Sequence, residues 1–176
     1  MQSVTTQRHD DVLVVLVNNP PVNALSWHVR QGLKDGFEEG LNDAAISAIV
    51  LRCDGTTFIA GADITEFGKP PQGPDFNDVL NMIEGASKPV VAAIHGTALG
   101  GGLEVALCAH YRIAVPSARC GLPEVNLGLL PGAGGPQRLP RITGPRKALE
   151  LITGGAHVPA SECLSMGLVD ALAGAR

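Results

Sequence analysis

The sequence has few aromatic residues and little net charge. Trp and Tyr occur once each and Phe four times, so aromatic residues make up 3% of the 176 positions. The formal net charge is −4, and the basic side chains are scattered along the chain. Surfaces that bind nucleic acids need a clustered basic patch or aromatic platforms on which bases stack. The composition therefore predicts no nucleic-acid partner.

Paired cysteines and metal-ligand spacings are also missing. The cysteines lie far apart with no CxxC pair, which favours buried free thiols over disulfides or zinc ligands. The histidines are dispersed and no HExxH occurs, so we predict no metal site, and we expect His95 to be a hydrogen-bonded core residue. The residues concerned are Cys53, Cys108, Cys120 and Cys163, and His9, His28, His95, His110 and His157.

No targeting or membrane-spanning segment is predicted. The opening MQSVTTQRHDD is polar, unlike a signal peptide. The longest apolar stretch, residues 89–115, contains Glu104, His110 and Arg112, which a lipid-embedded helix would carry at a heavy cost. We therefore expect an intracellular, soluble protein, in a bacterial cytoplasm or, in a eukaryote, in a peroxisome or mitochondrion.

What is present is the pattern of a globular α/β chain. Hydrophobic residues make up 45% and charged residues 17%, and the length suits one domain over residues 1–176. We expect two strands about a polar turn at residues 9–11, and then a helix from the N-cap Ser26 through Leu41. Strands and helices alternate from there to residue 166, in a rhythm of strand, strand, helix that indicates an α/β fold.

Three consecutive glycines precede a carboxylate in an apolar run. In HGTALGGGLEVALCAH, residues 95–110, Gly100, Gly101 and Gly102 open a predicted helix that carries Glu104 near its start. Glycines let a ligand approach the main chain, and unpaired N–H groups at a helix start stabilise an oxygen that gains negative charge. The structural alternative is that the glycines only permit tight packing and that Glu104 points to water.

Two other segments offer related groups. AGADITEF, residues 60–67, either presents a second backbone donor or forms an ordinary turn in which Asp63 caps a helix. GLPEVNLGLLPGAGG, residues 121–135, places Glu124 in an apolar run, as the second member of an acid/base pair or as a helix-start residue. None of these glycine patterns matches a phosphate-binding fingerprint.

Together these segments resemble the enoyl-CoA hydratase/isomerase (crotonase) family, and most closely the N-terminal hydratase module of bifunctional fatty-acid β-oxidation enzymes. The resemblance covers nearly the whole chain and implies a crotonase-like spiral of repeated strand-strand-helix units. The stretches that carry it are NNPPVNALS, FIAGADITEFGKP, KPVVAAIHGTALGGGLEVALCAHYRIAV, GLPEVNLGLLPGAGG and QRLPRITG.

The resemblance implies a role for each matching residue. Glu104 and Glu124 match the two catalytic glutamates, and the backbone N–H groups of Ala62 and Gly101 match the oxyanion hole for the thioester oxygen. Asp63 is expected to fix the loop that presents Ala62. Expected substrate contacts are Ala60, Asp63, Ile64, Gly100, Pro131 and Gly132.

The implied reaction is the reversible hydration of trans-2-enoyl-CoA to 3-hydroxyacyl-CoA in fatty-acid β-oxidation. It needs no metal or redox cofactor, since coenzyme A is part of the substrate. Two alternatives stay open: 3,2-enoyl-CoA isomerase activity at the same site, and a truncated, non-catalytic fragment that binds acyl-CoA or serves in assembly. An assay with crotonyl-CoA separates turnover from binding alone.

The sequence departs from the family at two points. Pro136 stands where the family has threonine; a proline is tolerated in the first turn of a helix. The chain also stops where family members continue with further helices, so we expect the C-terminal helical part to be absent or truncated. Apolar surface that those helices cover would then favour self-association or contact with the missing region.

Overall fold

A mostly polar strand and an apolar strand form an antiparallel hairpin at the start of the computed structural model, which describes residues 2–174. Strands β1 (Val4–His9) and β2 (Val12–Val17) pair in register from Val4 with Val17 to His9 with Val12. Asp10 makes the turn with a positive φ of 53°, a conformation that Asp adopts more readily than most residues. This confirms the two strands and the polar turn predicted from the sequence.

The strands belong to two sheets. The larger has the order β1-β2-β3-β5-β7-β10, in which every pair after the first is parallel. The smaller has the order β4-β6-β8-β9, with β4, β6 and β8 parallel. The remaining strands are β3 (Ala48–Cys53), β4 (Ile59–Ala60), β5 (Val90–Ile94), β6 (Thr97–Leu99), β7 (Tyr111–Ala114), β8 (Arg119–Gly121), β9 (Val158–Pro159) and β10 (Ala171–Leu172).

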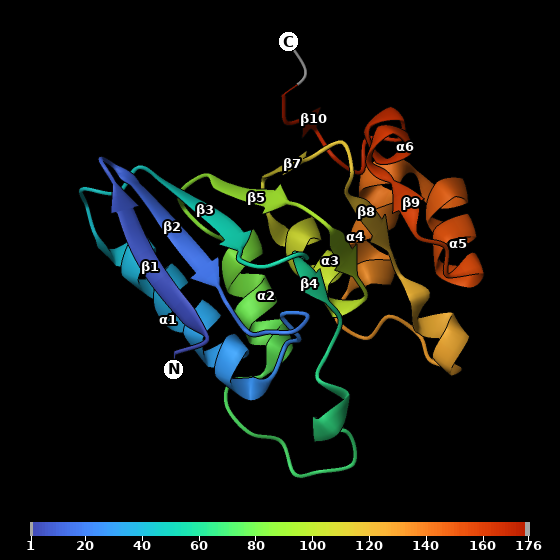
Figure 1. Ribbon diagram of the computed structural model, residues 1–176, viewed down its shortest axis with the longest axis horizontal. Coiled ribbons are helices and arrows are strands. Elements are labelled where there is room, and N and C mark those ends of the chain that lie inside the picture. The colour runs from blue at the N-terminus through green and yellow to red at the C-terminus, as the bar shows by residue number, and fades with distance from the viewer. Residues whose placement is uncertain (1, 175–176) are drawn as a thin grey trace.

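A repeated unit relates the two sheets. Each unit places one strand in the large sheet and the next in the small sheet, and then forms a helix: β3-β4-α2, β5-β6-α3 and β7-β8-α4. Each helix packs against the next, so the units succeed one another from α1 toward α5 (Figure 1). The helices are α1 (Trp27–Asn42), α2 (Phe76–Glu84), α3 (Gly101–Cys108), α4 (Gly135–Thr143), α5 (Pro145–Gly154) and α6 (Ala160–Ser165). The predicted α/β spiral of strand-strand-helix units is confirmed.

Helix α1 shows how the local sequence determines an element. Ser26 caps it by accepting a hydrogen bond from the N–H of Val29, which satisfies one of the free donors of the first turn. Of the apolar residues spaced along one face of α1, Val29, Leu33 and Phe37 are fully buried against the large sheet and Leu41 is partly buried. Their spacing follows the helical period, so one face of α1 enters the core.

Helix α3 lies entirely within the core. All eight of its residues are buried, and it packs between α2 and α4 beside the small sheet. The four cysteines are likewise buried and free, as predicted. Among the described residues, no helix combines the length and the apolar character needed to cross a membrane.

Candidate active site

The three glycines at the start of α3 differ in how far each position tolerates a side chain. Gly100 has a φ of +53°, which favours glycine, and it precedes the first turn. A Cβ at Gly102 would lie 2.1 Å from the carbonyl oxygen of Ile59, so only glycine lets α3 approach β4 this closely. A Cβ at Gly101 would meet the side chain of Leu25 at 3.0 Å. The tight packing expected of the glycines is confirmed at Gly102, and Gly100 and Gly101 also line the cavity described below.

Two backbone N–H groups converge at this point. Strands β4 and β6 run parallel, with Ala60 opposite Leu99, so the loop after β4 and the start of α3 lie at the same edge of the small sheet. This places the Ala62 nitrogen 3.8 Å from a Cβ built on Gly101. Within residues 2–174, neither the Ala62 N–H nor the Gly101 N–H donates to a protein acceptor. Two free donors that lie this close together suit an oxygen with developing negative charge.

Glu104 is buried and firmly oriented. Its side chain is 2% exposed, and its Oε1 accepts hydrogen bonds from the N–H groups of Ala133 and Gly135, both at 2.8 Å. Burial raises the pKa of Glu104 above the ordinary carboxyl value, while the two N–H groups and the charge of Arg138 act in the opposite direction. The alternative in which Glu104 points to water is wrong.

Glu124 enters the same site from the next unit. Strand β8 pairs beside β6, with Gly121 opposite Leu99, and the 3₁₀ turn Pro123–Leu127 follows it directly. A Cβ on Gly100 would lie 3.1 Å from Glu124 Oε1, so this carboxyl group lies against the glycine turn. Its buried Oε2 has no hydrogen-bond partner among the described residues. Burial raises the pKa of Glu124, and the charge of Glu104 raises it further.

One cavity of about 430 Å³ brings these groups together. Both glutamates, Ala62 and Gly101 line it. Of the other predicted contacts, Ala60, Ile64, Gly100 and Gly132 also line it, whereas Asp63 and Pro131 do not. An apolar portion completes the wall, formed by Phe67, Phe76, Leu99, Leu127, Leu129 and Leu130.

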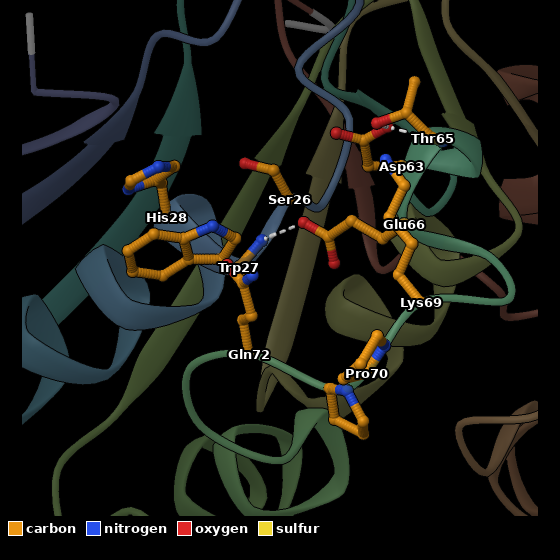
Figure 2. A pocket seen from close by; sticks show the side chains of 10 residues that line it. Ser26, Trp27, His28, Asp63, Thr65, Glu66, Lys69, Pro70 and Gln72 are labelled. Atoms are coloured by element: carbon orange, nitrogen blue, oxygen red, sulfur yellow. Dashed lines mark hydrogen bonds between the residues drawn. The ribbon is translucent and has the colours of Figure 1, made fainter.

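The loop that carries Ala62 is held from its other side. Glu66 accepts from the N–H of Trp27 at 2.6 Å and pairs with the Arg30 guanidinium at 2.9 Å, which ties the loop to the start of α1. Figure 2 shows the Glu66 side chain pointing toward Trp27. Both residues line a separate hollow of about 270 Å³. Asp63 lines this hollow and accepts from the N–H and hydroxyl of Thr65, so it stabilises the turn after Ala62, as expected.

Some functional residues were not predicted. The sequence predicted substrate contacts from Pro131 and Gly132 of PGAGG but no role for Ala133 and Gly135, which orient Glu104. The signal available was the clustering of glycines, which marks places where backbone approaches another group. Pro136 lies in the first turn of α4, where a proline is tolerated, and it does not line the cavity.

Residues 2–174 hold no group of three or more His, Cys, Asp or Glu placed to bind a metal ion. The expected hydrogen bond of His95 is present, since its Nε2 lies 3.2 Å from the carbonyl oxygen of Gly55, but the residue is half-buried and is not part of the core. The groups that the site offers for chemistry are its two carboxyl groups and its two free backbone donors.

Comparisons with known proteins show the family to which the chain is related. The family model for enoyl-CoA hydratase/isomerase matches residues 7–175. The chain is 54% identical to a peroxisomal bifunctional enzyme of Danio rerio, over 90% of this chain and 22% of that protein. It is 42% identical to a probable enoyl-CoA hydratase of Bacillus subtilis, over 96% of this chain and 68% of that protein.

A solved structure shows the same architecture. The enoyl-CoA hydratase of Bacillus anthracis superposes with a TM-score of 0.90 at 34% identity, covering 97% of this chain and 70% of that one. The chain thus spans about a fifth of the bifunctional relatives, for which the covered share is 22%. Since the family model covers most of the sequence and the fold agrees, this chain belongs to the enoyl-CoA hydratase/isomerase family.

Proposed function

We propose that the chain catalyses the reversible addition of water to a trans-2-enoyl-CoA, giving a 3-hydroxyacyl-CoA. The observation that carries the proposal is the arrangement of one cavity. Two carboxyl groups with raised pKa values, Glu104 buried and Glu124 half-buried, share it with two unpaired backbone N–H groups. Hydration of a conjugated thioester requires groups that transfer protons and, beside them, donors that stabilise the negatively charged thioester oxygen.

The N–H groups of Ala62 and Gly101 hold the thioester oxygen. As water adds at C3, electron density moves from the double bond to this oxygen and the thioester becomes an enolate. The two donors are fixed by the loop after β4 and by the first turn of α3, so they need no rearrangement when the charge develops. The partial positive charge at the start of α3 acts in the same direction.

The two carboxyl groups divide the proton transfers. Glu104 receives two N–H bonds and the field of Arg138, which favour its ionised form, so it takes the proton of the attacking water. Glu124 has its pKa raised by burial and by Glu104, so it holds the proton that is delivered to C2. Exchange with solvent returns a proton to Glu124 and removes one from Glu104 before the next turnover.

The same pair favours a second candidate activity. A proton removed from C4 of a 3-enoyl-CoA and returned at C2 would move the double bond to the 2-position, and both carboxyl groups face the cavity in which this would occur. Neither reaction draws on a cofactor besides the coenzyme A of the substrate, because carboxyl groups and N–H donors supply the chemistry.

The apolar mouth of the cavity points to a further contact. Ile64, Leu127 and Leu130 are 70%, 70% and 78% exposed, although each lines the cavity. Exposed apolar surface of this kind marks an interaction site. We propose that it is covered in the working enzyme by self-association or by a further region of the protein, in the intracellular setting expected from the sequence.

The test is product analysis with two substrates. The chain is incubated with crotonyl-CoA and, separately, with a 3-enoyl-CoA, and the products are separated by chromatography. Formation of 3-hydroxybutyryl-CoA from the first supports hydration, and formation of the 2-enoyl thioester from the second supports isomerisation. Binding of both thioesters without conversion of either would contradict an enzymatic role and favour the acyl-CoA-binding fragment.

A further inference from the structure

Residues 133–135, which orient Glu104, form a segment that we name the strap. The strap lies between two hollows. On one side is the cavity with the glutamates, which Ala133 lines and whose Glu104 is bound by the N–H of Gly135. On the other side is an open groove of about 700 Å³, whose lining includes Gly134 and Arg138 but not Glu104. Arg138 comes from the first turns of α4, and its side chain is only 12% exposed.

Arg138 holds this strap through its backbone. Its Nη1 donates to the carbonyl oxygen of Ala133 at 2.9 Å. That carbonyl belongs to the peptide between Ala133 and Gly134, which lies between the two peptides whose N–H groups bind Glu104. Fixing the middle peptide therefore fixes the direction of both donors.

Gly134 makes room for the guanidinium. It adopts a left-handed conformation with a φ of 89°, and a Cβ there would lie 2.2 Å from Arg138 Nη1. The other end of the guanidinium is held by α2, where Nη2 donates to Glu84 at 2.8 Å and to Asn81 at 3.3 Å. A planar fork held on both sides sets one geometry, which a flexible ammonium group cannot reproduce.

We propose that Arg138 is a positioning residue for Glu104. It holds the peptide of Ala133 so that two N–H groups meet one carboxylate oxygen and leave the other oxygen free for the reacting water. The proposal rests on the function proposed above and adds a residue that touches neither the substrate cavity nor the reacting atoms. Arg138 acts on Glu104 in two ways, through its hydrogen bond to the carbonyl oxygen of Ala133 and through its positive charge.

The positive charge of Arg138 acts on Glu104 together with the other titratable groups near that carboxyl group. Glu124 faces it from the turn after β8, Arg138 from α4 and Cys108 from its own helix, while Glu84 on α2 pairs with Arg138. Of these, Arg138 is the cation whose charge lowers the pKa of Glu104. Removing it leaves burial and the neighbouring carboxyl groups, so the pKa of Glu104 rises further.

The kinetic test compares Arg138→Met, Arg138→Lys and Arg141→Met. Arg138→Met is expected to lower kcat by about 10²-fold, the loss typical of a small displacement of a catalytic group, with little change in KM. The rising limb of the kcat–pH profile should move to higher pH, because Glu104 must be ionised to accept the proton of water. Arg138→Lys restores the charge and hence the pH limb, but only part of kcat.

Arg141→Met is the matched control. Arg141 is exposed on the same helix and bonds to the carbonyl oxygen of Gln137 within that helix. It should keep the kcat and the pH profile of the parent chain. Equal effects of the two Met variants, or a change of KM alone in Arg138→Met, would overturn the positioning role.

A measurement without turnover separates this proposal from the proposed function. Carbon-13 NMR titration of the Glu104 carboxyl group and hydrogen exchange of the Ala133 and Gly135 amides need no substrate. In Arg138→Met the titration midpoint should rise and both amides should exchange faster; unchanged values overturn the proposal even if the parent chain is active. If Arg138→Met does not fold, the same two measurements are made on Arg138→Lys. The expected result is faster exchange of the two amides with an unchanged titration midpoint of Glu104. Unchanged amide exchange would contradict the proposal.

Discussion

The backbone N–H of Gly135 donates to Oε1 of Glu104 over 2.8 Å. Gly135 is the first residue of α4, so the free N–H groups at the start of one helix hold the carboxyl group of its neighbour α3. The contact joins two successive units of the spiral. It explains how a glutamate that is 2% exposed is kept in a buried position with one oxygen still available for chemistry.

The oxyanion hole can be tested at a single N–H. Gly101 is the first residue of α3, a position where proline is tolerated and where its missing N–H breaks no helical hydrogen bond. Gly101→Pro should therefore stay folded but lose about 10²–10³ in kcat with crotonyl-CoA, because one donor to the thioester oxygen is removed.

Gly101→Ala provides the control for this variant. It keeps the N–H and adds the Cβ that meets Leu25 at 3.0 Å, so it reports the steric part of the change alone. Thermal melts check that both variants are folded. If the two lose activity equally, the N–H of Gly101 is not the group that stabilises the oxyanion.

The raised pKa of Glu104 predicts a pH-dependent stability. Between the ordinary carboxyl pKa and the raised one, the folded chain binds more protons than the unfolded chain, so the free energy of unfolding falls as pH rises through this window. Glu104→Gln keeps an oxygen that accepts from Ala133 and Gly135 but does not ionise. Relative to the parent chain, this variant should gain stability as pH rises above about 4.5.

Urea denaturation at a series of pH values measures this difference. The expected result is a gap between the variant and the parent chain that widens with pH and then levels off above the raised pKa. A gap that stays constant across the series would show that Glu104 ionises as easily in the folded chain as in the unfolded one.

Gly102 is predicted to matter for folding. A Cβ at this position would lie 2.1 Å from the carbonyl oxygen of Ile59, which is backbone and cannot rotate away. Gly102→Ala should therefore separate α3 from β4 and destabilise the chain by about 1–3 kcal/mol or more, as overpacking of a core does. Chemical denaturation measures the loss, and a variant as stable as the parent chain would contradict the close approach seen here.

Glu66 is predicted to hold the oxyanion loop. Its carboxylate binds the Trp27 N–H and Arg30, so Glu66→Ala frees the segment that presents Ala62. We expect kcat/KM to fall by up to about 10²-fold through misplacement of that donor. The melting temperature should fall modestly, since the pair is partly exposed.

Glu38→Ala is the comparison for Glu66→Ala. It removes an exposed ion pair with Lys34 on the outside of α1, and solvent and salt screen such pairs so that they contribute little to stability. Its activity should match that of the parent chain. A Glu66→Ala enzyme with the same kcat/KM would show that the loop keeps its position without this anchor.

Much of the fold could be predicted from local patterns in the sequence. The hairpin follows from the apolar run of β2 and the polar turn at Asp10, and α1 from its Ser26 cap and the spacing from Val29 to Phe37. The division of the strands between two sheets could not be read in this way. Strands as short as Ile59–Ala60 carry no periodic signal, and pairing them with distant strands depends on the tertiary fold.

The candidate site was predictable where residue type limits the chemistry. Two carboxyl groups in apolar runs and glycines before a helix point to acid/base work and to backbone donors. The support for Glu104 was not predictable, because Ala133 and Gly135 act through their N–H groups, which every residue but proline has. Arg138 was missed because its partners Ala133 and Glu84 come together only in the folded chain.

The central claim is that Glu104 and Glu124 carry out the hydration together. The most direct measurement is the initial rate at which the absorbance of the conjugated thioester of crotonyl-CoA is lost, in the parent chain, Glu104→Gln and Glu124→Gln. The account predicts turnover by the parent chain and a loss of about 10²–10⁴-fold in each folded variant, the range for removal of a general acid or base. A Glu124→Gln variant that hydrates crotonyl-CoA as fast as the parent chain would contradict it.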